Sequence, residues 1–391
     1  MKDSFNLASS PLLYFGAGKI SVLPSVVRTF GSRVLLVTGA KSFTASGHHK
    51  NLLGEFHSQG LSIEHLSVSI EPTPGIVDEA VKKTLPFGPD VIVAIGGGSV
   101  LDAGKAISAM LPLGEPVKNY LEGVGAKPAH PGVKVPFIAI PTTAGTGSEA
   151  AKNAVLSETG ENGYKRSLRH NNFVPNVAII DPDLTITCPQ ATTAASGMDA
   201  FTQLLESYLS TAGNAVTDAL AYEGLQQISK SLRQAYQSGT DIKARTGMAL
   251  AAYLSGITLT NTGLGIVHGF AASIGGYFPI AHGVICSSLM PASNRVTVRK
   301  LRSQRNNDNA LAKYAIIGKM FAGVENKSAE YYVDFLLGTI EKWTVEMNIP
   351  RLSQGGVTSS DFTKIVNATD NKNNPVVLSG DEMMEILEMA L

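Results

Sequence analysis

Continuous apolar runs recur through the first half of the chain and alternate with stretches of helical character. The runs are rich in β-branched residues and do not alternate with polar positions; they are Val34–Thr38, Val91–Ile95, Pro136–Ile140 and Val177–Ile180. Such runs are typical of parallel strands that are buried on both faces. The pattern therefore predicts a βαβ sheet in this half.

The pattern changes after Asp181 and Pro182. Ala, Leu, Gln and Glu then dominate, and the apolar positions follow helical spacing, as in residues 218–225. We expect residues 1–185 to form an α/β domain and residues 186–391 to form an all-helical domain. At 391 residues the chain is long enough for two domains that each have a full core.

Charge and cysteine content narrow the functional classes. The 32 basic residues equal the 32 acidic ones, and no basic run suggests a nucleic-acid surface. Neither a secretory h-region nor an apolar run of about 18 residues is found, so we expect a cytoplasmic protein with no membrane partner. Cys188 and Cys286 lack metal-ribbon spacing, and Cys286 is interpreted as a small core residue.

A glycine turn follows the second run directly, at Gly96, Gly97, Gly98 and Ser99. Glycines between a strand and a helix allow backbone N–H groups to approach a phosphate, which the helix dipole also favours. The same turn also occurs as a plain connection. A P-loop is excluded, because Ala106 follows Lys105 where that motif requires Ser or Thr.

A second loop, from Pro141 to Glu149, follows the next apolar run. Its hydroxyl groups suit ribose and phosphate oxygens; they belong to Thr142, Thr143, Thr146 and Ser148. Two such loops on neighbouring strand ends favour a dinucleotide site at the carboxyl edge of the sheet.

A metal site is predicted in the second half from Asp199, Gln203, His268 and His282. We expect Asp199 to open a helical segment that reaches Gln203, so that both side chains share one face. A carboxylate, an amide oxygen and two imidazoles can surround a divalent cation and leave one position open. Taken alone, an Asp–Gln pair at this spacing is more often a hydrogen-bonded surface pair than a ligand pair.

With these residues in view, the chain resembles the iron-containing (group III) alcohol dehydrogenase family over nearly its whole length. The matching segments are Phe15–Gly18, Gly96–Lys105, Pro141–Glu149, Gly197–Ala200 and Gly263–His268. The resemblance implies a Rossmann-like dinucleotide-binding α/β domain and a helical metal domain, on a scaffold like that of dehydroquinate synthase. It also implies a homodimer that transfers a hydride between NAD(P) and a small alcohol or aldehyde, with the active site between the domains.

The resemblance assigns roles to individual residues. Asp199, His268 and His282 become catalytic residues that hold Fe²⁺ or Zn²⁺ together with Gln203, which stands where the family usually has histidine. Glutamine is a harder and weaker donor than imidazole, so it should tilt the site toward Mn²⁺. Ala272, four residues after His268, replaces a histidine of many members and removes a proton relay. The cofactor contacts expected are Gly39, Lys41, Gly96, Gly97, Gly98, Ser99, Asp102, Thr142, Thr143, Thr146, Ser148 and Lys165.

Cofactor preference depends on the residues after the first strand. An acid there would bond the ribose 2′-hydroxyl and repel a 2′-phosphate, whereas Gly39 removes that repulsion and Lys41 can attract the phosphate. We therefore favour NADP(H) over NAD(H), with a solvated Lys41 as the alternative.

Three other functions remain open. A metal-independent reductase resembling maleylacetate reductases would tolerate the altered ligand set. A lyase of the dehydroquinate synthase type would need more basic residues near His268. A catalytically impaired nucleotide-binding protein would keep the loops without turnover.

Overall fold

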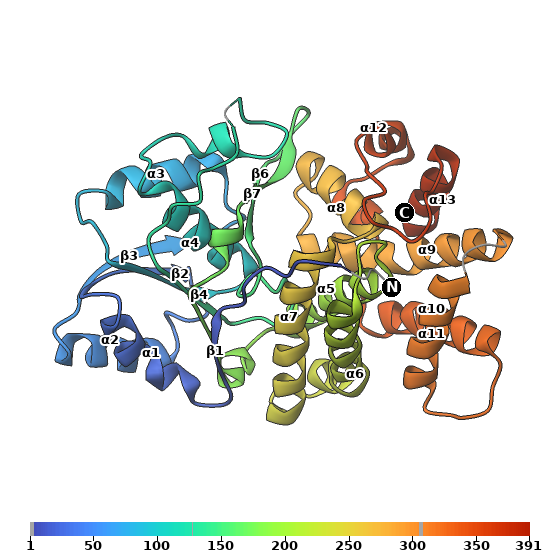
Figure 1. The fold of residues 1–391 in the computed structure, drawn as a ribbon, viewed down its shortest axis with the longest axis horizontal. Helices are drawn as coiled ribbons and strands as arrows, with labels where there is room; N and C mark the ends of the chain where they lie inside the picture. Colours follow the sequence, from blue (N-terminus) through green and yellow to red (C-terminus); the bar gives the residue numbers. More distant parts are fainter. Residues whose placement is uncertain (1–3, 127, 305–307) are drawn as a thin grey trace. The chain divides into compact units, whose positions relative to one another are not determined.

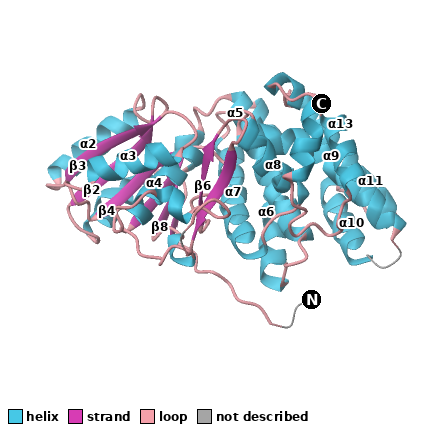
Figure 2. Cartoon of the chain, turned by 90° about the horizontal axis from the view of Figure 1, so that it is seen from above, coloured by secondary structure: helices cyan, strands magenta, loops and turns pink. Residues whose placement is uncertain are grey.

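The computed structural model describes residues 4–126, 128–304 and 308–391 (Figure 1). The contacts among these residues divide the chain into two compact units. The α/β unit comprises Ala8–Glu158 and Lys165–Cys188, and the helical unit comprises Pro189–Leu391 with Thr159–Tyr164 and residues 4–7. Figure 2 shows the strands gathered in the first unit and helices in the second.

The α/β unit is built on a six-stranded, all-parallel sheet with the order β1-β8-β5-β4-β2-β3. Its four central strands confirm the four runs that the sequence predicted. Sequence patterning missed β1 and β3 because both are edge strands with partly exposed residues. The strands are β1 (Leu12–Phe15), β2 (Arg33–Gly39), β3 (Ser62–Val68), β4 (Val91–Gly96), β5 (Phe137–Pro141) and β8 (Val177–Ile180).

Helices cover both faces of this sheet. Leu23 of α1 and Phe56 of α2 belong to the core cluster formed by one face. On the other face α4 approaches closely, because a Cβ at Gly104 would lie 2.8 Å from Ala94 Cβ. The helices are α1 (Leu23–Arg28), α2 (Gly47–Ser58), α3 (Pro74–Thr84) and α4 (Gly98–Met110), and β6 (Asn153–Glu158) pairs with β7 (Tyr164–Arg169) in a separate two-stranded sheet.

The helical unit packs around α5, which is buried from Gly197 to Leu209. In the described residues after 189 all regular elements are helices, which confirms the sequence prediction. Asp199 does not open a helix as expected: α5 begins at Gln190, directly after Pro189, and continues through Gly197. The α-helices are α5 (Gln190–Leu209), α6 (Ala215–Gln237), α7 (Ile242–Thr262), α8 (Ile266–Tyr277), α9 (His282–Ser303), α10 (Asp308–Ala322), α11 (Ala329–Glu346), α12 (Phe362–Asn367) and α13 (Gly380–Ala390).

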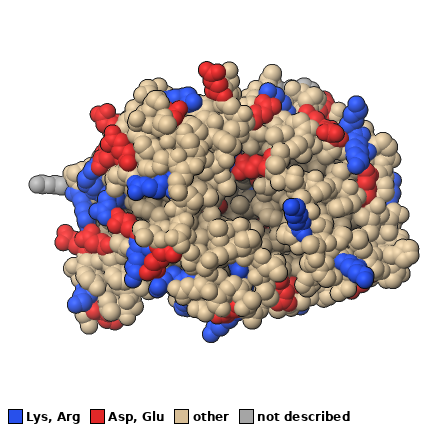
Figure 3. Space-filling model, turned by 180° about the vertical axis from the view of Figure 1, so that it is seen from behind, with Lys and Arg blue, Asp and Glu red and all other residues tan. Residues whose placement is uncertain are grey.

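Among the described helices, none is by itself long and apolar enough to cross a membrane. Only α7 and α8 taken together pass the length and composition test, and they are bent by 96° at their junction. On the face shown in Figure 3, basic and acidic side chains are interspersed and neither sign covers a continuous area.

Candidate metal centre and nucleotide loops

The two loops predicted to bind phosphate lie side by side in the α/β unit. β4 and β5 are parallel neighbours, and Gly96 O accepts a hydrogen bond from Thr142 N at 2.9 Å. A Cβ at Gly98 would lie 2.6 Å from Thr146 Cγ2, so only glycine permits this approach. Because Gly97 is the N-cap of α4 and has no side chain, the first N–H groups of the helix remain available to an anion.

Asp102 and Ser148, both predicted to contact the cofactor, bind each other. Ser148 Oγ donates to Asp102 Oδ1, and Val155 N donates to Asp102 Oδ2 at 3.0 Å. Lys105 Nζ donates to Ser148 O and to the carbonyl of Ala151, at 2.7 and 2.8 Å. These bonds fasten the second loop to α4, so Asp102 supports the shape of the loops.

Burial changes the titration of this network. It raises the pKa of Asp102, against the attraction of Lys105. It also raises the pKa of Glu149 to about 7 and lowers that of Lys105 to about 8. Burial therefore shifts both carboxyl groups beside the loops toward protonation.

The other predicted cofactor residues occupy separate places in the α/β unit. Gly39 ends β2, and a Cβ there would lie 3.7 Å from Val100 Cγ2 of α4, so this strand end adjoins the glycine turn. Lys41 is exposed just beyond it. Lys165 lies on β7, where Nζ pairs with Glu71 Oε2 at 2.7 Å.

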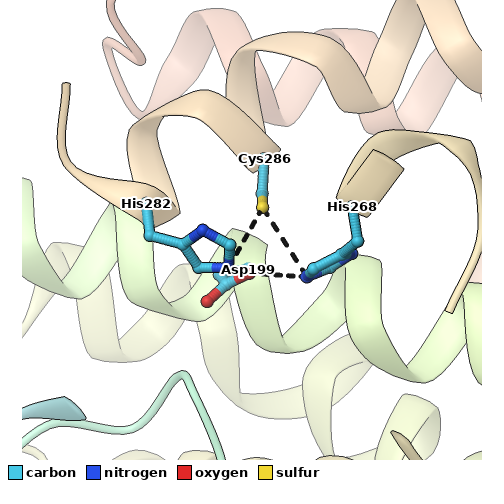
Figure 4. Close-up of side chains that lie close together, drawn as sticks. All are labelled: Asp199, His268, His282 and Cys286. Carbon is cyan, nitrogen blue, oxygen red and sulfur yellow. Dashed lines mark hydrogen bonds and ion pairs between the residues drawn. The ribbon is translucent and has the colours of Figure 1, made fainter. Parts of the chain in front are cut away.

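Three of the four predicted metal ligands converge in the helical unit. Asp199 comes from the middle of α5, His268 from the first turn of α8, and His282 is the first residue of α9. With Cys286 they form a cluster whose ligand atoms all lie within 4.8 Å of one another (Figure 4). His268 Nε2 lies 3.5 Å from Asp199 Oδ1.

The surroundings of the Asp199 carboxylate favour a cation in this cluster. The side chain is 1% exposed, and in the described part of the chain neither of its oxygens has a hydrogen-bond partner. Burial by itself raises the pKa of Asp199, but attraction to His282 and His268 outweighs it and the pKa is lowered. A buried, ionised carboxylate with no hydrogen bond is costly unless a cation compensates it.

Glu206 orients His268, a role that the sequence analysis missed. Glu206 Oε2 lies 2.7 Å from His268 Nδ1, and Oε1 accepts from Val267 N at 2.7 Å. Burial opposes protonation of His268, but Cys286, Glu206 and Asp199 together raise its pKa well above the usual value. When Nδ1 donates to Glu206, Nε2 is left to bind a metal, as in many carboxylate–histidine–metal arrangements. The spacing of seven residues from Asp199 was the available signal, because it places Glu206 near the same helix face.

Gln203 is not a surface residue. It is 2% exposed, and its Oε1 accepts a hydrogen bond from Ser255 Oγ of α7 at 2.8 Å. Ala272 lies one turn after His268 on α8 and carries no group that can transfer a proton.

Cys286 is buried, as expected from the sequence, and it also lies beside two of the predicted metal ligands. Its Sγ lies 3.6 Å from His268 Nε2 and 3.7 Å from His282 Nε2 (Figure 4). Burial raises the pKa of this thiol to about 12. Its position four residues after His282 on one helix was the signal that could have revealed it.

The family of the chain follows from its sequence. The model of the family "Iron-containing alcohol dehydrogenase" matches residues 10–182, and that of "Fe-containing alcohol dehydrogenase family, C-terminal" matches residues 193–391. The chain therefore belongs to the iron-containing alcohol dehydrogenase family, which confirms the resemblance.

Curated relatives match over nearly the full length. Alcohol dehydrogenase 4 of Saccharomyces cerevisiae (strain YJM789) is 32% identical, with 97% of each chain covered. The NAD-dependent methanol dehydrogenase of Bacillus methanolicus is 28% identical over 99% of this chain and 100% of its own. The NADPH-dependent butanol dehydrogenase of Clostridium saccharobutylicum is 30% identical over 96% and 95%.

Solved structures share the fold. A 1,3-propanediol oxidoreductase superposes with a TM-score of 0.87 at 29% identity, covering 99% of this chain and 100% of its own. The α/β fold with a helical second domain is thereby confirmed. Together these relatives support an alcohol dehydrogenase or aldehyde reductase.

Proposed function

We propose that this protein is a metal-dependent, NAD(P)-linked alcohol dehydrogenase or aldehyde reductase that acts on a small alcohol or aldehyde. The observation that carries the proposal is the buried Asp199 carboxylate, which faces two imidazoles and has no hydrogen-bond partner among the described residues. A site of this composition suits Fe²⁺ or Zn²⁺.

In this proposal Asp199, His268 and His282 hold the cation. A divalent cation bound there supplies Lewis-acid polarisation of the substrate oxygen, which can contribute several kcal/mol in the transition state. Glu206 keeps the His268 ring oriented through its 2.7 Å contact with Nδ1. Because Ala272 cannot transfer a proton, another group or water must carry the proton of the reaction.

The nucleotide is held by the two loops of the α/β unit. The N–H groups at the start of α4 bind the pyrophosphate, and the Thr142–Ser148 loop lies against them. The nicotinamide supplies or accepts the hydride. We propose NADP(H) as the preferred cofactor, because Gly39 adds no negative charge and Lys41 is exposed beside it. The ratio of kcat/KM with NADPH to that with NADH measures this preference.

The test combines metal content with turnover. Protein purified without chelator should contain about one Fe, Zn or Mn ion per chain and should oxidise or reduce members of a panel of small alcohols and aldehydes. His268→Ala should lose the metal and reduce turnover by at least about 1,000-fold, as expected when several kcal/mol are lost. Its affinity for NAD(P)H should stay unchanged, and His57→Ala, on the exposed side of α2, is the control.

Two results would contradict the proposal. Turnover that persists in His268→Ala and in chelator would identify a metal-independent reductase. Cofactor binding with no turnover across the panel would identify a nucleotide-binding protein without catalytic activity.

A further inference from the structure

The distances around Cys286 fit a metal ligand better than a packing residue. Zn²⁺ binds nitrogen and oxygen at about 2.0–2.2 Å and sulfur at about 2.3 Å, so tetrahedral ligand atoms lie about 3.3–3.6 Å apart. Cys286 Sγ lies 3.6 and 3.7 Å from the Nε2 atoms of His268 and His282. Asp199 Oδ1 lies 3.5 Å from His268 Nε2. These separations are close to those of an assembled site.

The amide of Gln203 is held differently. Its Oε1 lies 2.8 Å from Ser255 Oγ, whose single proton is shared with Ala252 O at 2.7 Å. An amide oxygen is also a weak donor for a first-row cation compared with a thiolate. Ser255 is itself completely buried, so it fixes Gln203 within the core.

We propose that Cys286, in place of Gln203, is the fourth protein ligand of the metal, which gives a site of Asp199, His268, His282 and Cys286. This inference rests on the proposed function, since it requires a divalent cation at the cluster. As the cation binds, the S–H bond of Cys286 breaks, the proton goes to solvent and a metal–sulfur bond forms. One carboxylate and one thiolate then neutralise the two positive charges of the cation.

A thiolate ligand reverses the metal preference expected from Gln203. Soft sulfur favours Zn²⁺, Fe²⁺ or Co²⁺, whereas carboxylate and amide oxygens suit Mn²⁺. With four protein ligands in place, the substrate oxygen would bind as a fifth ligand or displace one of the four. Catalytic zinc sites can expand to five ligands in the transition state. Cys286 on α9 thus supplies the fourth ligand, where other members of the family usually have a histidine at the position of Gln203.

The experiment is X-ray absorption at the zinc edge, on the full-length protein reconstituted with Zn²⁺. Wild type, Cys286→Ser, Cys286→Ala and Gln203→Ala are compared. Cys188→Ser is the matched control, because Cys188 is the only other cysteine and lies outside the cluster. A parallel competition measures the Zn²⁺ over Mn²⁺ preference of each variant.

We expect one sulfur scatterer at about 2.3 Å in wild type, Gln203→Ala and Cys188→Ser, and none in the two Cys286 variants. The preference for Zn²⁺ over Mn²⁺ should fall by about tenfold or more in Cys286→Ser, as even the loss of an outer-shell partner costs that much. If the Cys286 variants fail to fold, the scatterer in the wild-type spectrum still decides the question.

Zinc bound to wild type through nitrogen and oxygen alone would overturn the Cys286 inference and leave the proposed function standing. A wild-type protein that binds neither zinc nor iron nor manganese would overturn both. The two failures are therefore distinguishable.

Discussion

The nucleotide loops and the metal cluster both contain carboxyl groups away from solvent, but the pKa values of these groups shift in opposite directions. Beside the loops, burial raises the pKa of Asp102 and brings that of Glu149 to about 7. In the metal cluster the pKa of Asp199 is lowered, although the side chain is 1% exposed. In the α/β unit burial thus shifts these acids toward protonation, whereas in the helical unit the neighbouring histidines keep Asp199 ionised.

Hydrogen bonding shows the same contrast. Both oxygens of Asp102 accept bonds, from Ser148 Oγ and Val155 N, whereas neither oxygen of Asp199 does among the described residues. A complete internal network gives a rigid frame that presents backbone N–H groups to a ligand. An incomplete one indicates that a ligand belongs to the structure. Asp102 therefore maintains the shape of the nucleotide loops, whereas Asp199 is available to bind a ligand.

The largest effect that we expect concerns Glu149. Its pKa of about 7 in the folded protein lies above the usual 4.5, so the folded state retains the proton longer than the unfolded state. Stability relative to Glu149→Gln should therefore be unaffected at pH below about 4.5 and fall as pH rises toward 7, by up to about 3 kcal/mol. Urea unfolding of both proteins between pH 5 and pH 8 measures the difference. A difference that does not change with pH would show that Glu149 ionises as an exposed acid does.

Glu206→Gln tests the metal side of the comparison. The amide has one acceptor oxygen, whereas the two carboxylate oxygens of Glu206 now bind Val267 N and His268 Nδ1. His268 therefore loses its fixed orientation. We expect metal affinity to fall by about 10- to 100-fold, with NAD(P)H affinity unchanged. Competition against a metal chelator of known affinity measures it. Glu341→Gln, which removes an exposed ion pair with Arg295, is the control and should leave metal affinity as it is. Equal metal affinity in Glu206→Gln would place Glu206 outside the metal site.

The two regions also differ in how far the sequence predicts them. The loops follow buried strands directly, so Gly96–Ser99 and Thr142–Ser148 could be placed at neighbouring strand ends from local pattern alone. Asp199, His268 and His282 come from three different helices, so their convergence depends on how those helices pack. A cysteine outside any metal-binding spacing predicts a core residue, and the contact of Cys286 with two histidines depends on how α8 and α9 pack. Edge strand β3 was missed for a related reason, since its exposed side carries polar residues that break the apolar run.

Gly98→Ala tests the nucleotide side, with the smallest expected effect. The new Cβ would meet Thr146 Cγ2 at 2.6 Å and Oγ1 at 2.8 Å, so the second loop must move away from the glycine turn. Overpacking of this kind costs typically about 1–3 kcal/mol, and a loss near the lower end corresponds to about tenfold weaker NAD(P)H binding.

Metal content in Gly98→Ala should match wild type, because the substitution and the metal ligands belong to different units. Gly75→Ala, in the first turn of α3, is the matched control, since its nearest contact would be Thr73 Oγ1 at 3.8 Å. Fluorescence titration with NADPH separates the two variants. Unchanged affinity in Gly98→Ala would mean that the nucleotide does not use the close packing of the two loops. The network of Asp102, Ser148 and Lys105 would then serve stability alone, and the contrast with the metal cluster would no longer distinguish two ligand sites.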